Sequence, residues 1–323
     1  MKQQHGGALH EELDHDAYTY AMQLPALKPQ THSFPIIERI LRLLCSYSIL
    51  TFSSSTDAQG RSIVRYGAAP VCRYLAPDKN GNSIASLVLM IQDKVLMDTW
   101  YHFKDTLLKG ESPFNSTYGM SLFDYTAKDL RFNALFNDAM KGHTHIIMNK
   151  VMESYPGFHD VDVVVDIGGG LGSTLKMIVE RYPHIKGINF DLPHVISQAA
   201  HIPGVEHVGG DMFDAIPSGD LILMKWILHD WSDESSIKVL KNCRNSLHKN
   251  GKVVIVEYII PDEPQQTSEA RVVFHADMIM LAHNPGGKER KEEEFKNLAK
   301  KSGFSRFNSQ YFYANACVME FIK

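Results

Sequence analysis

The chain contains few of the features that build a disulfide framework or a membrane span. Only 4 of its 323 residues are cysteine, and Cys45, Cys72, Cys243 and Cys317 show no paired spacing. Scattered cysteines indicate neither a disulfide framework nor a zinc site, and they favour a reducing compartment. No apolar run is long enough for a spanning helix, and residues 1–18 resemble neither a signal peptide nor a transit peptide. These absences predict a cytoplasmic protein.

The chain also lacks a large charge of either sign. The net charge is −4, the charged share is 22% and the hydrophobic share is 44%, values that are ordinary for a globular protein. Such a balance argues against a nucleic-acid surface as the main function. A length of 323 residues is too great for one core. We therefore expect two domains, a mostly helical one over residues 1–150 and an α/β one over residues 151–323.

The N-terminal region combines an amphipathic helix with a hairpin. The pattern predicts a helix over Ile36–Ser48 and strands over Ile49–Phe52 and Ser62–Tyr66. A helix followed by a two-stranded wing is also typical of winged-helix DNA-binding domains. The helix, however, carries only Arg39 and Arg42 among its leucines. This composition favours a buried or dimer-forming face over DNA recognition.

The most informative segment runs from Val163 to Asp191 and reads VVVDIGGGLGSTLKMIVERYPHIKGINFD. An apolar strand, a glycine-rich turn, a helical pattern and a second apolar strand follow one another. This order predicts the first half of a nucleotide-binding parallel sheet. The glycines allow a sharp turn and a close approach to a ligand, and Asp191 is placed to accept hydrogen bonds from ribose hydroxyls.

Two adenosine-bearing cofactors suit such a turn, a nicotinamide dinucleotide and S-adenosylmethionine. The dinucleotide fingerprint requires a third glycine where this chain has Ser173, and no Tyr-x-x-x-Lys pair follows. The spacing of Asp166, Gly168, Gly170 and Gly172 is closer to the first motif of methyltransferases. A nicotinamide-dependent oxidoreductase remains the second hypothesis.

Three later segments place polar side chains after strands. Asp211 and Met212 follow a short apolar stretch, His229 follows the predicted strand Leu221–Trp226, and Glu257 ends the strand that begins at Val253. Ligands of open parallel sheets bind at the carboxyl ends of the strands. We therefore expect these side chains to face one crevice.

With these residues in view, the chain resembles the plant small-molecule O-methyltransferases of the caffeic acid, flavonoid and alkaloid type. The resemblance covers residues 98–323 and rests on the motifs VDIGGGLG, NFDLPHVI, GVEHVGGDMF, MKWILHDWSDE, LKNC, NGKVVIVE and MLAHNPGGKER taken together. It implies a Rossmann-like sheet with helices on both faces, a winged-helix-like dimerisation domain, S-adenosylmethionine as cofactor, a homodimer and a small phenolic acceptor.

The resemblance also implies roles for the cofactor residues. Asp191 binds the ribose hydroxyls, Asp211 and Met212 lie against the adenine, Lys225 contacts a nearby edge, and Gly168 admits the methionine portion.

For the chemistry, His229 is the expected general base. A phenol has a pKa of about 10 and is a poor nucleophile at neutral pH, whereas a histidine can accept its proton during the attack. Glu257 and Glu289 are expected to hold the imidazole, in the manner of the carboxylate of a hydrolase triad. A histidine base makes a metal ion unnecessary.

His143 and His145 suggest a metal site, but no third ligand lies near them in the sequence and the surrounding pattern is helical. A histidine that faces a pocket is the favoured interpretation. By resemblance, the acceptor pocket is lined by Met90, Ile91, Thr126, Phe132, Phe136, Met140, His143, Trp226, Ile279, Met280 and Asn284. Core packing is the alternative for each apolar member, because Met and Phe at helical spacing usually belong to the core.

Two positions bear on the acceptor. Ile91 and Thr126 stand where caffeic-acid-type enzymes carry asparagine and histidine, so this pocket is predicted to be less polar. A bulky neutral phenol, such as a lignan, flavonoid or phenylpropene, is favoured over a small acid, with caffeic or 5-hydroxyferulic acid 3-O-methylation as the alternative. The chain also departs from the family between Leu24 and Pro25, where a few dozen expected residues are absent.

Overall fold

The computed structural model describes residues 34–79 and 81–323. The departure noted between Leu24 and Pro25 lies outside these residues. The described chain divides into two compact units, one that ends at Ser83 and one that runs from Ile84 to Lys323. The division differs from the boundary expected near residue 150, because the helices after Ser83 pack with later helices of the second unit.

The first unit contains the predicted helix and hairpin. Helix α2 spans Phe34–Ser46, strands β1 (Leu50–Thr56) and β2 (Ser62–Ala68) pair in antiparallel fashion, and α3 (Cys72–Leu75) follows. The turn between the strands is closed by the Asp57 carboxylate, which accepts hydrogen bonds from the Gln59 and Arg61 backbone. Among residues 35–79, Ala69 alone is buried. This unit therefore has little core of its own.

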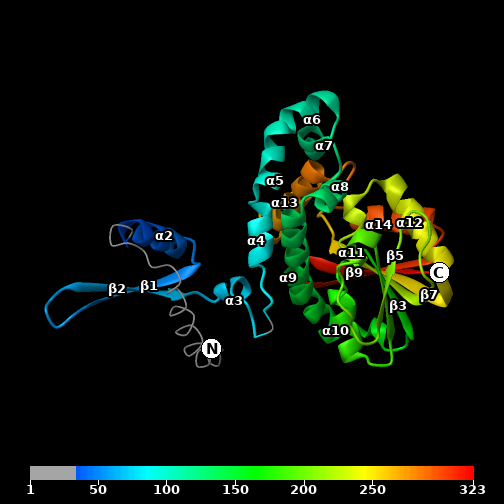
Figure 1. Cartoon of the computed structure of the whole chain (residues 1–323), viewed down its shortest axis with the longest axis horizontal. Coiled ribbons are helices and arrows are strands. Elements are labelled where there is room, and N and C mark those ends of the chain that lie inside the picture. The colour runs from blue at the N-terminus through cyan, green and yellow to red at the C-terminus, as the bar shows by residue number, and fades with distance from the viewer. Residues whose placement is uncertain (1–33, 80) are drawn as a thin grey trace, which may run out of the picture. The chain divides into compact units, whose positions relative to one another are not determined.

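The second unit begins with helices and continues as an alternation of strands and helices (Figure 1). Its helical part comprises α4 (Ala85–Ile91), α5 (Lys94–Met97), η3 (Asp98–His102), α6 (Phe103–Lys109), α7 (Pro113–Tyr118), α8 (Leu122–Lys128), α9 (Leu130–Ser154) and η4 (Pro156–Phe158). The α/β part comprises β3 (Val163–Ile167), α10 (Ser173–Arg181), β4 (Lys186–Asp191), α11 (Pro193–Ile196), β5 (Val205–Gly209), β6 (Gly219–Lys225), η5 (Leu228–Asp230), α12 (Asp233–Ser246), β7 (Leu247–Tyr258), α13 (Ser268–His283), α14 (Glu292–Lys301), β8 (Arg306–Tyr313) and β9 (Ala316–Ile322).

The seven-stranded sheet has the order β5-β4-β3-β6-β7-β9-β8. The first five strands are parallel, and β9 and β8 complete the edge in antiparallel pairing. The chain reverses direction across the sheet between β3 and β6, which is where doubly wound folds bind their ligands. The predicted Rossmann-like sheet with helices on both faces is confirmed, and the winged-helix-like dimerisation domain stays a prediction.

Both faces of the sheet are covered by helices, as Figure 1 shows. Alternate residues of a strand point to opposite faces. Val165 accordingly packs in one apolar cluster with α12 and α14, and the adjacent Val164 packs in another with α9 and α10. Burial on both sides explains why the strands read as continuous apolar runs.

A third apolar cluster holds the helices before the sheet together. It joins α4, α5, α7, α8 and α9 through side chains that include Met90, Phe114 and Phe132. Helix α9 belongs to this cluster at its N-terminal half and to the sheet at its C-terminal half. The helical part is thus attached to the catalytic sheet by one continuous helix.

None of the helices that the structure describes is both long enough and apolar enough to cross a bilayer.

Candidate active site

The polar residues singled out in the sequence lie together at the carboxyl ends of the parallel strands. Strands β3, β4, β5, β6 and β7 are parallel, so their carboxyl ends lie on the same side. The register aligns Asp191 at the end of β4 with Gly209 at the end of β5. Lys225 at the end of β6 is likewise aligned with Val256 of β7. The topology itself therefore brings the predicted cofactor and base positions together.

The glycine turn after β3 requires glycine at several positions. Gly168, Gly170 and Gly172 all have positive φ, at 64°, 58° and 85°. A Cβ on Gly168 would lie 2.3 Å from Ile227 Cδ1, whereas the space beside Gly170 is open. The turn therefore presents bare backbone toward the crevice, as a close ligand contact needs.

Asp191 stands beside this turn with its carboxylate at the sheet edge. It accepts hydrogen bonds from the backbone N–H of Gly170 at 2.8 Å and of Leu192 at 2.7 Å. Burial raises its pKa, and the two backbone N–H groups lower it. The carboxylate oxygens also have lone pairs that these two bonds leave available. Asp191 is therefore suited to hold a hydroxyl pair above the turn.

The other predicted cofactor residues surround the same edge. Asp211 is exposed just past β5, Met212 is half-buried beside it, and Lys225 ends β6. Burial lowers the pKa of Lys225 to about 8, while Asp166 and Glu257 oppose that shift. Asp166 is buried in β3, one residue before the strand ends, and burial raises its pKa to about 7. The crevice thus combines ionisable groups of both signs at low solvent exposure.

His229 lies in η5, directly after β6, and it is buried. Its Nδ1 is 2.8 Å from Glu289 Oε1. A carboxylate only accepts hydrogen bonds, so Nδ1 carries the proton and Nε2 is left as the acceptor of the neutral ring. The expected pairing of His229 with Glu289 is thus present in the geometry.

Glu257 contacts the backbone of this loop instead of the imidazole ring. Its Oε1 accepts hydrogen bonds from the N–H groups of Ile227 at 3.0 Å, Leu228 at 2.6 Å and His229 at 3.4 Å. The expectation that Glu257 holds the imidazole directly is therefore corrected. The backbone leaves β6 in a turn whose N–H groups point at the end of β7, so the carboxylate satisfies them first.

The acidic surroundings control the basicity of His229. Burial by itself lowers its pKa, but the charges of Glu289 and Asp230, the hydrogen bond that the ring donates to Glu289 and the charge of Glu257 raise it to about 9. His143 behaves in the opposite way, because burial lowers its pKa to about 3. The site therefore contains one basic imidazole and one that stays neutral.

Some predicted acceptor residues lie beside the loop that carries His229. The ring of His143 packs edge-on against Trp226 at 4.5 Å, and Asn284 Nδ2 donates to Asp230 Oδ1 at 2.6 Å. Met280 contacts the same amide through its sulfur at 3.5 Å. Trp226 adopts a left-handed backbone with φ of 53°, which turns the chain sharply out of β6. These four residues are therefore connected to the His229 loop.

The remaining acceptor candidates lie in the helices. Met90 and Phe132 are buried in the third apolar cluster, and Ile91, Phe136 and Met140 pack against it. Thr126 is buried, and its hydroxyl donates to Phe123 O at 2.9 Å. Ile279 is half-buried on α13. The structure thus gives Met90 and Phe132 a packing role, and their place in an acceptor pocket stays a prediction.

Sequence reasoning gave no role to several residues of the site. Asp230 lies with its Oδ1 3.7 Å from His229 Nε2, and burial raises its pKa to about 7. Asp277 accepts the backbone N–H of Glu289 at 2.9 Å. Arg290 is completely buried against the loop that carries His229. Only the adjacency of Asp230 and Arg290 to the predicted residues could have pointed to them.

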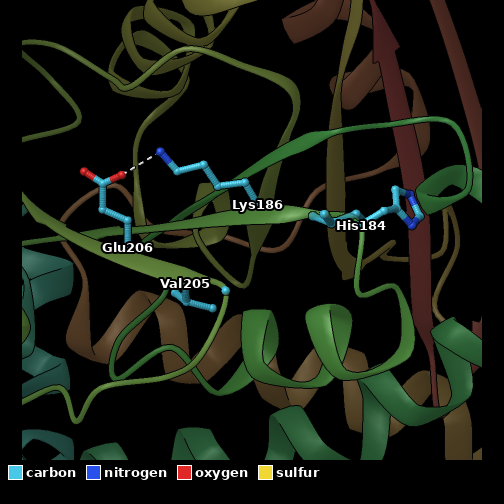
Figure 2. A pocket seen from close by; sticks show the side chains of 6 residues that line it. His184, Lys186, Val205 and Glu206 are labelled. Carbon is cyan, nitrogen blue, oxygen red and sulfur yellow. Dashed lines mark ion pairs between the residues drawn. The ribbon is translucent and has the colours of Figure 1, made fainter.

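A surface hollow of about 420 Å³ lies elsewhere, beside His184, Lys186, Val205 and Glu206 (Figure 2). Lys186 and Glu206 form an ion pair of 2.8 Å across it. Lys186 and Val205 begin β4 and β5, so the hollow lies at the amino ends of the strands, opposite the edge that carries Asp191. It is therefore separate from the site.

The described residues contain no group of three His, Cys, Asp or Glu side chains placed to hold a metal ion. His143 and His145 both lie on α9 but have different neighbours. The ring of His143 packs against Trp226, whereas His145 Nε2 is 3.2 Å from Asn149 Nδ2.

Comparison with known proteins agrees with this geometry. Residues 100–305 match the model of the O-methyltransferase domain family. A tricetin 3',4',5'-O-trimethyltransferase of Triticum aestivum is 56% identical over 288 residues, which cover 89% of this chain and 81% of that protein. A caffeic acid 3-O-methyltransferase of Ocimum basilicum is 52% identical over 303 residues, or 94% of this chain and 83% of that protein.

Solved structures share the fold. The crystal structure of LaPhzM superposes with a TM-score of 0.74 at 30% identity, over 88% of this chain and 84% of that one. Human N-acetylserotonin methyltransferase, solved in complex with S-adenosylmethionine, has a TM-score of 0.76 at 20% identity over 88% of this chain and 82% of that one, and this likeness concerns the fold alone. The chain therefore belongs to the O-methyltransferase family and is an S-adenosylmethionine-dependent O-methyltransferase.

Proposed function

We propose that the protein transfers the methyl group of S-adenosylmethionine to a phenolic hydroxyl of a plant secondary metabolite, with His229 as general base and without a metal. The observation that carries this proposal is the contact of 2.8 Å between His229 Nδ1 and Glu289 Oε1. It leaves Nε2 as the acceptor, at the sheet edge where Asp191 and the glycine turn lie. Relatives named for tricetin and caffeic acid act on phenols, which fits this chemistry.

When bound, S-adenosylmethionine supplies a methyl group on a sulfonium, which an oxygen nucleophile can take. Open space at Gly170 and the Asp191 carboxylate fit such a cofactor. His229 Nε2 accepts the phenolic proton as the oxygen attacks, and Glu289 stabilises the imidazolium that forms. A phenol has a pKa of about 10. With a pKa of about 9, the ring acts as the base in its neutral form, and that form accepts the phenolic proton at little cost in free energy.

The base assignment predicts that His229→Ala abolishes methyl transfer while the cofactor product still binds. General-base catalysis typically contributes about 10²- to 10⁴-fold in rate. Cofactor binding should persist, because the imidazole is not part of the glycine turn and does not contact Asp191. Single-turnover methyl transfer and calorimetry with S-adenosylhomocysteine measure the two effects separately. His145→Ala, which removes a histidine from α9 elsewhere, is the matched control and should keep wild-type turnover.

The wild-type enzyme should keep its activity in EDTA, because a histidine base makes a divalent cation unnecessary; a metal-assisted mechanism would lose activity in EDTA and regain it with Mg²⁺. Near-wild-type turnover of His229→Ala at neutral pH would exclude His229 as the base. Stabilisation of the fold by NAD and not by S-adenosylhomocysteine, measured as a shift of Tm, would favour the oxidoreductase alternative.

The second prediction concerns the cofactor. Asp191→Ala should raise the Kd of S-adenosylhomocysteine at least about tenfold, because a hydrogen bond to a charged group contributes roughly 1.5 to 3 kcal/mol. Calorimetry of the folded mutant measures this change. Asp160→Ala, which removes an exposed carboxylate, is the control. An unchanged Kd for Asp191→Ala would contradict the placement of the ribose.

For the acceptor, we propose a neutral phenol larger than a hydroxycinnamic acid. The Thr126 hydroxyl already donates within its own helix, and Ile91 offers no polar atom. A carboxylate buried without a partner costs more than an unpaired dipole. A lignan, flavonoid or phenylpropene fits this pocket better than caffeic or 5-hydroxyferulic acid.

The third prediction tests that preference. Wild type should methylate tricetin with a higher kcat/KM than caffeic acid. Ile91→Asn combined with Thr126→His should shift the ratio toward caffeic acid, by about tenfold for each restored hydrogen bond. Ile91→Val with Thr126→Ser is the size-matched control and should keep the wild-type ratio. A wild type that prefers caffeic acid would refute the role of these two positions, but not the role of His229.

We also propose that the protein is a homodimer, as the resemblance implies, with α2 in the interface. Ile36, Ile40 and Leu43 form one stripe along this helix and are exposed by 57%, 54% and 57%, and Tyr47, just after the helix, is exposed by 73%. Such a contiguous apolar surface is typical of an interface. In the second unit, Tyr101, Leu107 and Leu108 are also exposed.

A cytoplasmic location suits the four cysteines, which are all free.

The fourth prediction is that Ile40→Glu with Leu43→Glu converts the dimer into a monomer, because each buried charge lacks a partner across the interface. Light scattering after size-exclusion chromatography measures the mass. Arg42→Gln changes a polar position of the same helix and should leave the mass unchanged. A wild-type chain that is monomeric at micromolar concentration would refute the proposal.

A further inference from the structure

Arg290 is a completely buried charged side chain next to the site, and nothing in the proposed chemistry uses it. Its guanidinium lies under the loop that leaves β6. Nη1 donates to Leu228 O at 2.7 Å, and Nη2 donates to Trp231 O at 2.7 Å. These two carbonyls flank His229 on both sides. A single planar group therefore holds the two ends of the short segment that carries the base.

The other side of the guanidinium is anchored in α12. Nε donates to Asp233 Oδ1 at 3.0 Å, and Nη2 also reaches Ser236 Oγ at 3.3 Å. Asp233 is the one carboxylate that forms an ion pair with Arg290 within the described residues. The contacts of the guanidinium thus join the first turn of α12 to the His229 loop.

The backbone of Arg290 is fixed as well. Its carbonyl accepts the N–H of Ile260 at 2.9 Å, just after β7. Two residues earlier, the N–H of Lys288 donates to His229 O at 2.9 Å. Between these two backbone contacts lies Glu289, whose N–H is held by Asp277. The segment that carries Glu289 is therefore also hydrogen-bonded to the loop that carries His229.

We propose that Arg290 is a positioning residue that holds His229 at hydrogen-bonding distance from Glu289 by clamping the carbonyls of Leu228 and Trp231. This inference rests on the proposed role of His229 as the base. Arginine suits the task because its donors lie in one rigid plane, whereas lysine is a point charge on a flexible stem. A displacement of about 1 Å at a catalytic group can cost about 10²-fold in rate.

The test compares Arg290→Gln and Arg290→Lys with Glu289→Gln and wild type. The groups that face His229 are Glu289, Asp230, Glu257 and His143. In wild type, kcat/KM for the acceptor rises with pH toward the pKa of His229, because the neutral ring is the base. Glu289→Gln removes the negative charge that raises this pKa most, so the rising limb should move to lower pH. The same acceptor is used throughout, so its own ionisation is common to all profiles.

If Arg290 acts by positioning, both Arg290 variants should lose about 10- to 100-fold in kcat. Their rising limbs should move to lower pH, in the direction of Glu289→Gln, because the contact between His229 and Glu289 is lost. The Kd of S-adenosylhomocysteine should stay within about twofold of wild type, since the glycine turn and Asp191 lie on other strands. Arg290→Lys keeps the positive charge and therefore tests only the planar arrangement of the guanidinium donors.

Lys291→Met is the matched control. It removes a positive charge from the next residue, whose Nζ contacts Asp262 Oδ1 at 3.4 Å. Its pH profile and kcat should equal those of wild type. Arg290→Ala assayed with millimolar guanidinium, and with urea as the uncharged planar comparison, gives a further measure: positioning predicts recovery of kcat with guanidinium and none with urea.

Other outcomes overturn the proposal. Arg290→Lys could lower Tm while keeping the wild-type kcat and the wild-type rising limb of the pH profile. That result would show that Arg290 has only a structural role. A limb that moves to higher pH would indicate a direct effect of the lost positive charge on the imidazole. If Glu289→Gln itself leaves the limb unchanged, the His229–Glu289 assignment fails, and the role of Arg290 fails with it.

Discussion

The site depends on buried charged groups, each of which is held by hydrogen bonds to nearby backbone or side-chain atoms. His229, Glu289, Glu257 and Arg290 are all buried at the ends of β6 and β7, where water cannot solvate them. Removing one member of such a group leaves its partner charged and unpaired, which typically costs about 3 to 5 kcal/mol. The arrangement is therefore stable only when the strand exits, the loop after β6 and the segment before α14 are all in place. This interdependence fixes the position of the His229 ring in the structure.

The same burial determines the chemistry. Two histidines lie near Trp226, yet their pKa values shift in opposite directions. Burial lowers the pKa of His143 to about 3 because no carboxylate is paired with it, whereas Glu289 and Asp230 overcome burial and raise the pKa of His229 to about 9. The difference lies in the neighbours and not in the residue type. An imidazole that is basic enough to take a phenolic proton can therefore stand beside one that contributes only shape and a neutral ring.

Much of the fold was predictable because it depends on local pattern. The glycine turn, the strands around it and the amphipathic α2 could be read from spacing and composition, and they appear with shifts of a few residues. The boundary between the units could not be read in this way. Helix α9 starts in the apolar cluster of the preceding helices and ends on the sheet, so the helices after Ser83 belong to the same unit as the sheet. Which elements form one compact unit depends on side-chain packing between distant segments, and residue periodicity does not contain that information.

By itself, the sequence determined the strand ends that carry Gly168, Asp191, Asp211, Lys225 and His229, since parallel strands must place their carboxyl ends on one edge. It also pointed to Glu289 through the motif that surrounds it. Only the tertiary structure decided what each acid does. Glu257 accepts three backbone N–H groups and Glu289 holds the ring, although both are single carboxylates that follow apolar or glycine-rich segments. The contacts of Arg290 with the His229 loop were likewise decided only by the tertiary structure. The direction of a side chain after a strand end depends on the path of the next loop, and that path is decided by contacts with residues 30 to 60 positions away.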